Sequence, residues 1–166
     1  MTGDRARVSV ALDVPPSLAF AIFTEEIDRW WRRGSKFRHA GARRGLLCIE
    51  PEVGGRLFES IDAGGDPTVV EVGRVRVWDP PQRLAFTWRN VNFAPDECTE
   101  VEVEFVPIPA GTLVTVTHYG LSALPNDHPA RHGLQGAEFS RMMGLWWGEQ
   151  MTSLRLICST SGKPRS

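Results

Sequence analysis

Five consecutive segments with strand-like patterns fill most of the stretch between residues 56 and 119, and this succession limits the fold more than any other feature. The segments cover residues 56–61, 68–78, 82–89, 99–106 and 112–119. Turn sequences such as Gly65-Asp66-Pro67 separate them, and short connections of this kind favour antiparallel neighbours. The sequence therefore predicts an antiparallel meander.

Two of these segments have a clean two-residue period, which gives each strand one apolar and one polar face. Apolar residues alternate with polar or small ones over residues 84–89, and with glutamates over residues 100–105. In the longest segment the period changes phase at Gly73, as a β-bulge would produce. The apolar face of such a sheet must be buried on another element.

Helical patterns before and after these strands can supply that cover. Residues 7–14 form another alternating strand, and Pro15 and Pro16 then favour a short helix or helix pair that ends near Trp31. A further strand is expected over residues 46–49. From residue 139 to residue 158, apolar residues recur at intervals of three and four, as in one long amphipathic helix. The predicted class is α+β, with one seven-stranded sheet covered by helices.

Length and charge narrow the class of protein further. A chain of 166 residues fits one domain, which we place at residues 8–159 between polar tails at 1–7 and 160–166. The formal net charge of −1 argues against a nucleic-acid partner. No segment approaches the roughly 20 apolar residues that span a bilayer, and the first residues do not form a signal peptide. We therefore expect a cytoplasmic protein without a membrane span.

The cysteines do not predict a metal site or a disulfide. Cys48, Cys98 and Cys158 are far apart and lack the spacing of a zinc site or of a disulfide framework. His128 and His132 are four residues apart, but Pro129 and the turn-rich sequence around it disfavour the helix that a metal pair would need. No cofactor is expected.

Several pieces of the chain match one superfamily in their order and spacing. They are residues 16–31 with Trp30-Trp31, the run Glu52-Val53-Gly54-Gly55-Arg56-Leu57-Phe58, residues 73–88, residues 111–118, and residues 144–154 around Trp147. Together they resemble the START-like (SRPBCC, helix-grip) superfamily, in the branch homologous to the C-terminal domain of the activator of heat-shock-protein ATPase. The resemblance implies a curved seven-stranded antiparallel sheet around the C-terminal helix, two short helices after the first strand, and a hydrophobic cavity. It implies no catalytic motif.

The six tryptophans are the strongest candidates for a binding site in such a cavity. We expect a small hydrophobic, aromatic or lipid-like ligand to contact side chains on the elements that face one another: Trp30, Trp31, Phe58, Val75, Phe86, Trp88, Val116, His118, Met143, Trp146 and Trp147. The alternative is that these residues are simply packed core. Because tandem residues cannot share one helix face, one member of each Trp-Trp pair is expected to face a loop, a sheet edge or a partner subunit.

Two polar residues on the strands require separate interpretation. His118 shares strand parity with Val114 and Val116, so it is predicted to face inward. There it is either a histidine satisfied within the core or an acid or base toward a ligand. Glu59 lies among apolar residues, where an inward carboxylate is costly unless it is paired, with Arg74 or Arg76 as the candidate partner. The alternative, which we expect, is a solvated pair on the strand face.

Charged runs of opposite sign suggest a homodimer as a further hypothesis. A basic loop covers residues 32–44, and an acidic strip contains Asp96, Glu97, Glu100, Glu102 and Glu104. The strip of one subunit could meet the loop of another. Such runs are more often solvated faces.

Three classes of function follow from the sequence. The first is non-catalytic binding of a small hydrophobic ligand. The second is a cyclase, dehydratase or hydrolase acting on an aromatic or polyketide-like substrate, with His118 as the candidate catalytic residue. The third is a protein-interaction role of the co-chaperone kind.

Overall fold

The computed structural model of the chain describes residues 5–34, 37–38, 40, 44–62, 66–89, 99–120 and 137–161. In chain order the elements are β1 (Arg5–Leu12), α1 (Pro16–Glu25), α2 (Ile27–Trp30), β2 (Gly45–Ile49), β3 (Arg56–Ile61), β4 (Thr68–Asp79), β5 (Arg83–Trp88), β6 (Thr99–Ile108), β7 (Gly111–Tyr119) and α3 (Ala137–Ser161). The predicted strands and helices are confirmed, and only their ends differ. The first strand begins at Arg5, inside the segment that the sequence assigned to a polar tail.

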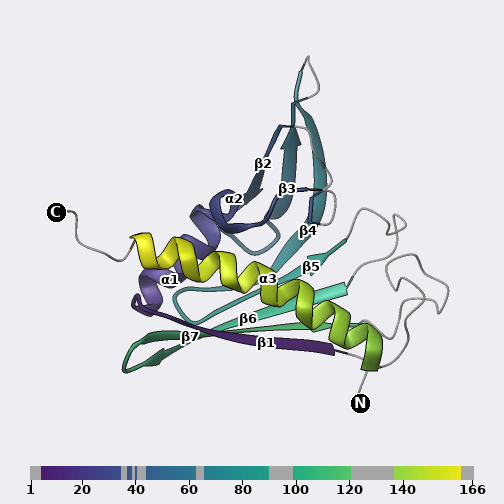
Figure 1. Cartoon of the computed structure of the whole chain (residues 1–166). Coiled ribbons are helices and arrows are strands. Elements are labelled where there is room, and N and C mark those ends of the chain that lie inside the picture. The colour runs from purple at the N-terminus through teal and green to yellow at the C-terminus, as the bar shows by residue number, and fades with distance from the viewer. Residues whose placement is uncertain are drawn as a thin grey trace.

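The seven strands form one antiparallel sheet in the order β1-β7-β6-β5-β4-β3-β2. Strands β3 to β7 are therefore the predicted meander, which β2 extends by pairing with β3 and β1 extends by pairing with β7. Figure 1 shows that the sheet curls, with β2, β3 and β4 at one end and β1 and β7 at the other. This is the predicted helix-grip α+β fold.

Helix α3 provides most of the cover for the concave face (Figure 1). It runs along β1, and its C-terminal half lies beside α1 and α2. The side of α3 that faces the sheet is fully buried at Phe139, Trp147, Leu154 and Cys158, whereas Leu145 and Leu156 on the outside are 69% and 61% exposed. The apolar period in the sequence thus identified the buried face of the helix.

Strand β4 changes register against both of its neighbours. The pairing of β4 shifts against β3 next to Gly73, and against β5 between Val75 and Val77. A Cβ atom at Gly73 would lie 1.9 Å from the carbonyl oxygen of Thr87, so only glycine fits this close approach. The phase change in the sequence correctly predicted an irregularity at this point.

The described part of the chain has neither a membrane-spanning helix nor a metal cluster. None of the helices in the described ranges has the length and apolar composition that crossing a membrane requires. Among the same residues, no group of three His, Cys, Asp or Glu side chains is placed to hold a metal ion. His128 and His132 lie outside the described residues.

Candidate functional site

Six aromatic side chains meet under α3 and around Trp31, and we call them the aromatic cluster: Trp30, Trp31, Phe37, Trp88, Trp146 and Trp147. The ring centroid of Trp31 lies 5.1 Å from Trp88, 5.3 Å from Trp30 and 5.7 Å from both Trp146 and Trp147. Phe37 extends the cluster, with its ring 5.4 Å from that of Trp146. The spacing is typical of edge-to-face and tilted aromatic pairs.

Both members of each tandem tryptophan pair are buried, and Trp146 faces Phe37 in the connection after α2. Trp30 is the last residue of α2, and Trp31 follows it with an extended backbone (φ −66°, ψ 119°). The two side chains therefore leave the chain in different directions and still reach one core. On α3, Trp147 points at the sheet, and Trp146 is covered by Phe37 and Trp31.

His118 lies beneath this cluster and uses both ring nitrogens. Its Nδ1 accepts a hydrogen bond from the Trp147 indole N–H over 3.0 Å. Its Nε2 lies 2.5 Å from the Thr99 hydroxyl, and that hydroxyl donates to the Trp88 carbonyl over 3.3 Å. The only arrangement that satisfies all three bonds has the proton on Nε2, because an indole N–H can only donate.

Burial also sets the charge of His118. The residue is fully buried, and loss of hydration lowers the pKa of the imidazole to about 3. At neutral pH the ring is uncharged, and its one acceptor nitrogen is already occupied. The inward orientation predicted from strand parity is confirmed, and the geometry is that of a core histidine satisfied by side chains.

The two described thiols, of the half-buried Cys48 and the buried Cys158, are poor nucleophiles. Burial, and then the charges of Asp13 and Glu26, raise the pKa of Cys158 to about 12. Burial and the charge of Asp28 also raise the pKa of Cys48. Neither residue is suited to covalent catalysis.

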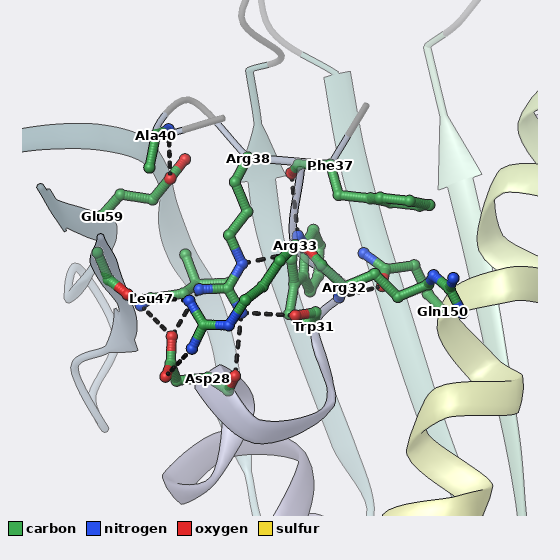
Figure 2. A network of polar contacts seen from close by, with 11 residues as sticks. Asp28, Trp31, Arg32, Arg33, Phe37, Arg38, Ala40, Leu47, Glu59 and Gln150 are labelled. Carbon is green, nitrogen blue, oxygen red and sulfur yellow. Dashed lines mark hydrogen bonds and ion pairs between the residues drawn. The ribbon is translucent and has the colours of Figure 1, made fainter. Parts of the chain in front are cut away.

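Arg38 fixes the segment that carries Trp31. Its guanidinium is 2% exposed and donates to the Asp28 carboxylate at 2.6 Å, to the Asp28 carbonyl at 3.0 Å and to the Trp31 carbonyl at 2.5 Å. Figure 2 shows this side chain folded back over the turn between α2 and β2. Arg38 thus holds the backbone of the residue at the centre of the aromatic cluster.

Asp28 completes this network from α2. Its carboxylate also accepts the Leu47 backbone N–H at 2.8 Å and pairs with the exposed Arg33 at 3.0 Å. Burial alone would raise the pKa of Asp28, but the bond from Leu47 and the charges of Arg38 and Arg33 outweigh it and keep that pKa below its usual value. The network ties α2 to the edge strand β2.

Glu59 points inward, contrary to the solvated pair expected from the sequence. The side chain is 2% exposed and accepts the backbone N–H of Ala40 at 3.0 Å (Figure 2). Arg74 instead pairs with Glu71 at 2.7 Å. A backbone donor in the connection to β2 satisfies this carboxylate, and a sequence pattern does not reveal such a donor.

Gln150 of α3, one helical turn after Trp146 and Trp147, is a buried polar residue that the sequence analysis did not single out. It is fully buried, and its Oε1 accepts the backbone N–H of Arg32 at 2.8 Å. Its Nε2 has no hydrogen-bond partner among the described residues. A signal was present, because a glutamine three and four positions after Trp147 and Trp146 interrupts the apolar face of an amphipathic helix.

The remaining predicted ligand residues divide between the two faces of the sheet. Val75, Phe86 and Val116 are buried on the inner face, and Met143 is half-buried on α3. Phe58 lies on the opposite face of β3 from the buried Leu57 and Glu59, with the Arg56 guanidinium 4.7 Å from its ring centre. Strand alternation excludes it from the interior, so its assignment to the ligand site is wrong.

Two grooves among the described residues lie away from the aromatic cluster. One, of about 630 Å³, lies between Pro16, the β4–β5 turn and β6, and the other, of about 290 Å³, lies between α1, Ile49 and Trp78. None of the predicted ligand residues lines either groove.

The charged runs are partly neutralised within the chain. Glu102 pairs with Arg83 at 3.0 Å, and Glu100 lies 3.9 Å from Arg76. In the basic loop, Arg33 and Arg38 pair with Asp28. These pairs occupy charges on which the dimer hypothesis relied; Asp96 and Glu97 of the acidic strip lie outside the described residues.

The curled sheet, the gripped helix and the apolar interior define a START-like protein, a class compatible with ligand binding or cyclase-type activity. Residues 13–157 match the family described as "Activator of Hsp90 ATPase homolog 1-like protein", and the chain belongs to this family. No curated protein matches the sequence.

Solved structures support the same fold. An Hsp90 activator from Plasmodium falciparum is 19% identical, with 99% of this chain and 100% of that chain covered and a TM-score of 0.62. A protein from Nitrosomonas europaea is 17% identical, with 96% of each chain covered and a TM-score of 0.64. The anthrahydroquino-γ-pyrone synthase Txn09 is 28% identical, with 94% of this chain and 97% of that chain covered and a TM-score of 0.58.

Proposed function

We propose that this protein binds a small planar aromatic molecule against the aromatic cluster, at the edge formed by Phe37 and Trp146. The observation that carries the proposal is the concentration of five of the six tryptophans in one contact group. Flat rings stack well on indole faces and edges, and apolar pockets with few polar groups are the usual sites for such ligands.

The Phe37 and Trp146 edge is the side from which a ligand would approach. Trp146 is 7% exposed and Phe37 is 6% exposed, whereas Trp30 and Trp147 are completely buried. The exposed Arg32 guanidinium lies 5.6 Å from the centre of the Phe37 ring. Met142 and Met143 beside Trp146 are half-buried, and methionine side chains adapt readily to a ligand.

The likeness to Txn09 supports an aromatic ligand. That protein is a synthase of an anthrahydroquino-γ-pyrone by its name. A related ring system would suit a wall of tryptophans, because both are flat and polarisable.

Calorimetric titration with 2-anthracenesulfonate, a soluble three-ring probe, tests this function. The wild-type protein should bind the probe saturably, and Trp146→Leu should weaken binding at least about tenfold, as loss of an indole that contacts the ligand does at other recognition sites. Trp78→Phe is the matched control, because Trp78 lines the groove beside α1 and lies outside the aromatic cluster. Lack of binding, or binding sensitive to Trp78 and not to Trp146, would refute the proposal.

An enzyme acting on an aromatic or polyketide-like substrate is the second candidate, and the 28% identity to a synthase favours it. His118 is poorly suited to be its acid or base, because the ring is neutral and both nitrogens are engaged. Incubating the protein with an aromatic polyketide-like substrate, and analysing products by mass spectrometry, separates the candidates. Turnover that is lost in His118→Ala while binding remains would support the enzyme with His118 as its catalytic residue.

A further inference from the structure

The side chain of Gln150 is oriented by one hydrogen bond and leaves its donor group unused. Oε1 accepts the Arg32 backbone N–H at 2.8 Å, and Figure 2 shows the side chain reaching from α3 toward Arg32. Exchanging the amide oxygen and nitrogen would place two donors against each other, so the bond fixes Nε2 as the free end. Among the described residues no acceptor lies within hydrogen-bond reach of Nε2.

An unused buried donor is unusual and costly. Most buried polar atoms in proteins have a partner, and a donor left without one loses its hydration without compensation. Contact with Arg32 requires only the oxygen of Gln150, so the NH₂ group adds nothing to that contact. The cost is understandable if a ligand atom supplies the missing acceptor.

The position of Gln150 relates this donor to the aromatic cluster. Gln150 lies three and four residues after Trp147 and Trp146, a spacing that places side chains on the same side of a helix. Its hydrogen-bond partner Arg32 directly follows Trp31, the centre of the aromatic cluster. A flat ligand on this cluster would therefore lie on the same side of α3 as the amide.

We infer that Gln150 recognises an oxygen acceptor on the ring of the ligand, so that the preferred ligands are planar aromatic ketones or quinones. The inference rests on the proposed function, because it concerns the same site. The aromatic cluster contacts the ring faces, and Nε2 of Gln150 donates to a ring carbonyl. An aromatic hydrocarbon of the same shape leaves the donor unpaired.

Two matched probes test this selectivity: anthraquinone-2-sulfonate, which carries two ring carbonyls, and 2-anthracenesulfonate, which carries none. The quantity of interest is the ratio of their affinities, measured by calorimetry in wild-type protein and in variants. Gln150→Met removes the amide at similar length, and Gln150→Glu keeps an acceptor for Arg32 while removing the donor. Each variant should reduce the ratio of quinone affinity to hydrocarbon affinity by about tenfold. That is the change in affinity expected from the loss of one good hydrogen bond to a buried donor.

Gln82→Met is the control for any effect of a glutamine-to-methionine change that does not depend on the binding site. Gln82 is exposed in the β4–β5 turn, so the same chemical change there should leave the ratio unaltered. A second measurement does not depend on the stability of any variant. In ¹⁵N-labelled wild-type protein, the side-chain amide signals of Gln150 should shift with the quinone and move little with the hydrocarbon.

The outcomes separate this inference from the proposed function. Equal ratios in wild-type and Gln150 variants, with both probes still bound at the aromatic cluster, would overturn the role of Gln150 and leave the binding function intact. If the side-chain amide signals of Gln150 do not shift with the quinone, the role of Gln150 is likewise overturned. Nε2 would then be assigned to contact with an indole face. Failure of both probes to bind would remove the proposed function and this inference with it.

Discussion

The Trp147 indole N–H donates to Nδ1 of His118 over 3.0 Å, so that the long helix is bonded to strand β7 of the sheet through two buried side chains. The imidazole Nε2–H donates to the Thr99 hydroxyl, and that hydroxyl donates to the carbonyl of Trp88. The chain of bonds connects α3, β7, β6 and β5. It places two tryptophans of the aromatic cluster in fixed positions.

Thr99→Val should lower the free energy of unfolding, because it breaks this chain of bonds. Valine has nearly the same shape, but it leaves the His118 N–H without an acceptor, which should cost about 1–3 kcal/mol of unfolding free energy. Thr99→Ser keeps the hydroxyl and should cost less than Thr99→Val. Urea unfolding of the three proteins provides the comparison, and equal losses for the two variants would contradict the predicted bond.

The free energy of unfolding should fall as the pH is lowered, over a pH range set by the pKa values of His118 in the unfolded and folded states. The folded pKa of about 3 is below the unfolded value of about 6.5, so the unfolded state binds a proton that the folded state excludes. The contribution of this residue is complete above pH 6.5 and declines by at most about 1.4 kcal/mol per pH unit as the pH falls toward 3.

His118→Leu removes this titration. Its unfolding free energy should therefore depend less on pH between about 6.5 and 4 than that of the wild-type protein. Chemical denaturation at a series of pH values gives both curves. Parallel curves across that range would show that His118 is protonated in the folded state.

Arg38 and Arg33 share the Asp28 carboxylate and should differ strongly in their effect on stability. Arg38→Met removes a buried guanidinium and leaves several acceptors without donors, which should cost about 3–5 kcal/mol. Arg33→Met removes a pair whose arginine is 60% exposed, and should cost less than about 1 kcal/mol.

Thermal and urea unfolding of the two methionine variants measure this difference. Arg38→Met should also alter the near-ultraviolet circular dichroism of the tryptophans, because Arg38 holds the Trp31 carbonyl. Similar small losses in both variants would mean that Arg38 does not organise the aromatic cluster.

The sequence predicted the order of strands and helices because their signals are local. Alternation over residues 100–105 and the apolar period of α3 depend on the residues themselves, and turn sequences separate the strands. The irregularity at Gly73 was also predictable, because the phase change of the pattern lies within one strand. Strand parity likewise placed His118 inside.

The errors arose where contacts between distant segments decide the outcome. The orientation of Glu59 depends on the backbone N–H of Ala40, which comes from another part of the chain. That Trp30 and Trp31 reach one core was not predictable either, because the backbone becomes extended after α2 and helix periodicity gives no sign of that change. Phe58 was expected among the ligand residues, although its alternation with Leu57 and Glu59 assigns it to the outer face.

The indole N–H signals of the six tryptophans provide the most direct test of ligand binding at the aromatic cluster. In ¹H–¹⁵N spectra recorded during titration with 2-anthracenesulfonate, the signals of Trp146 and Trp31 should shift most, and the signal of Trp78 should remain in place. Assignment by single Trp→Phe variants identifies each signal. Saturable shifts confined to Trp78, or six unchanged signals at saturating probe, would contradict the proposed site.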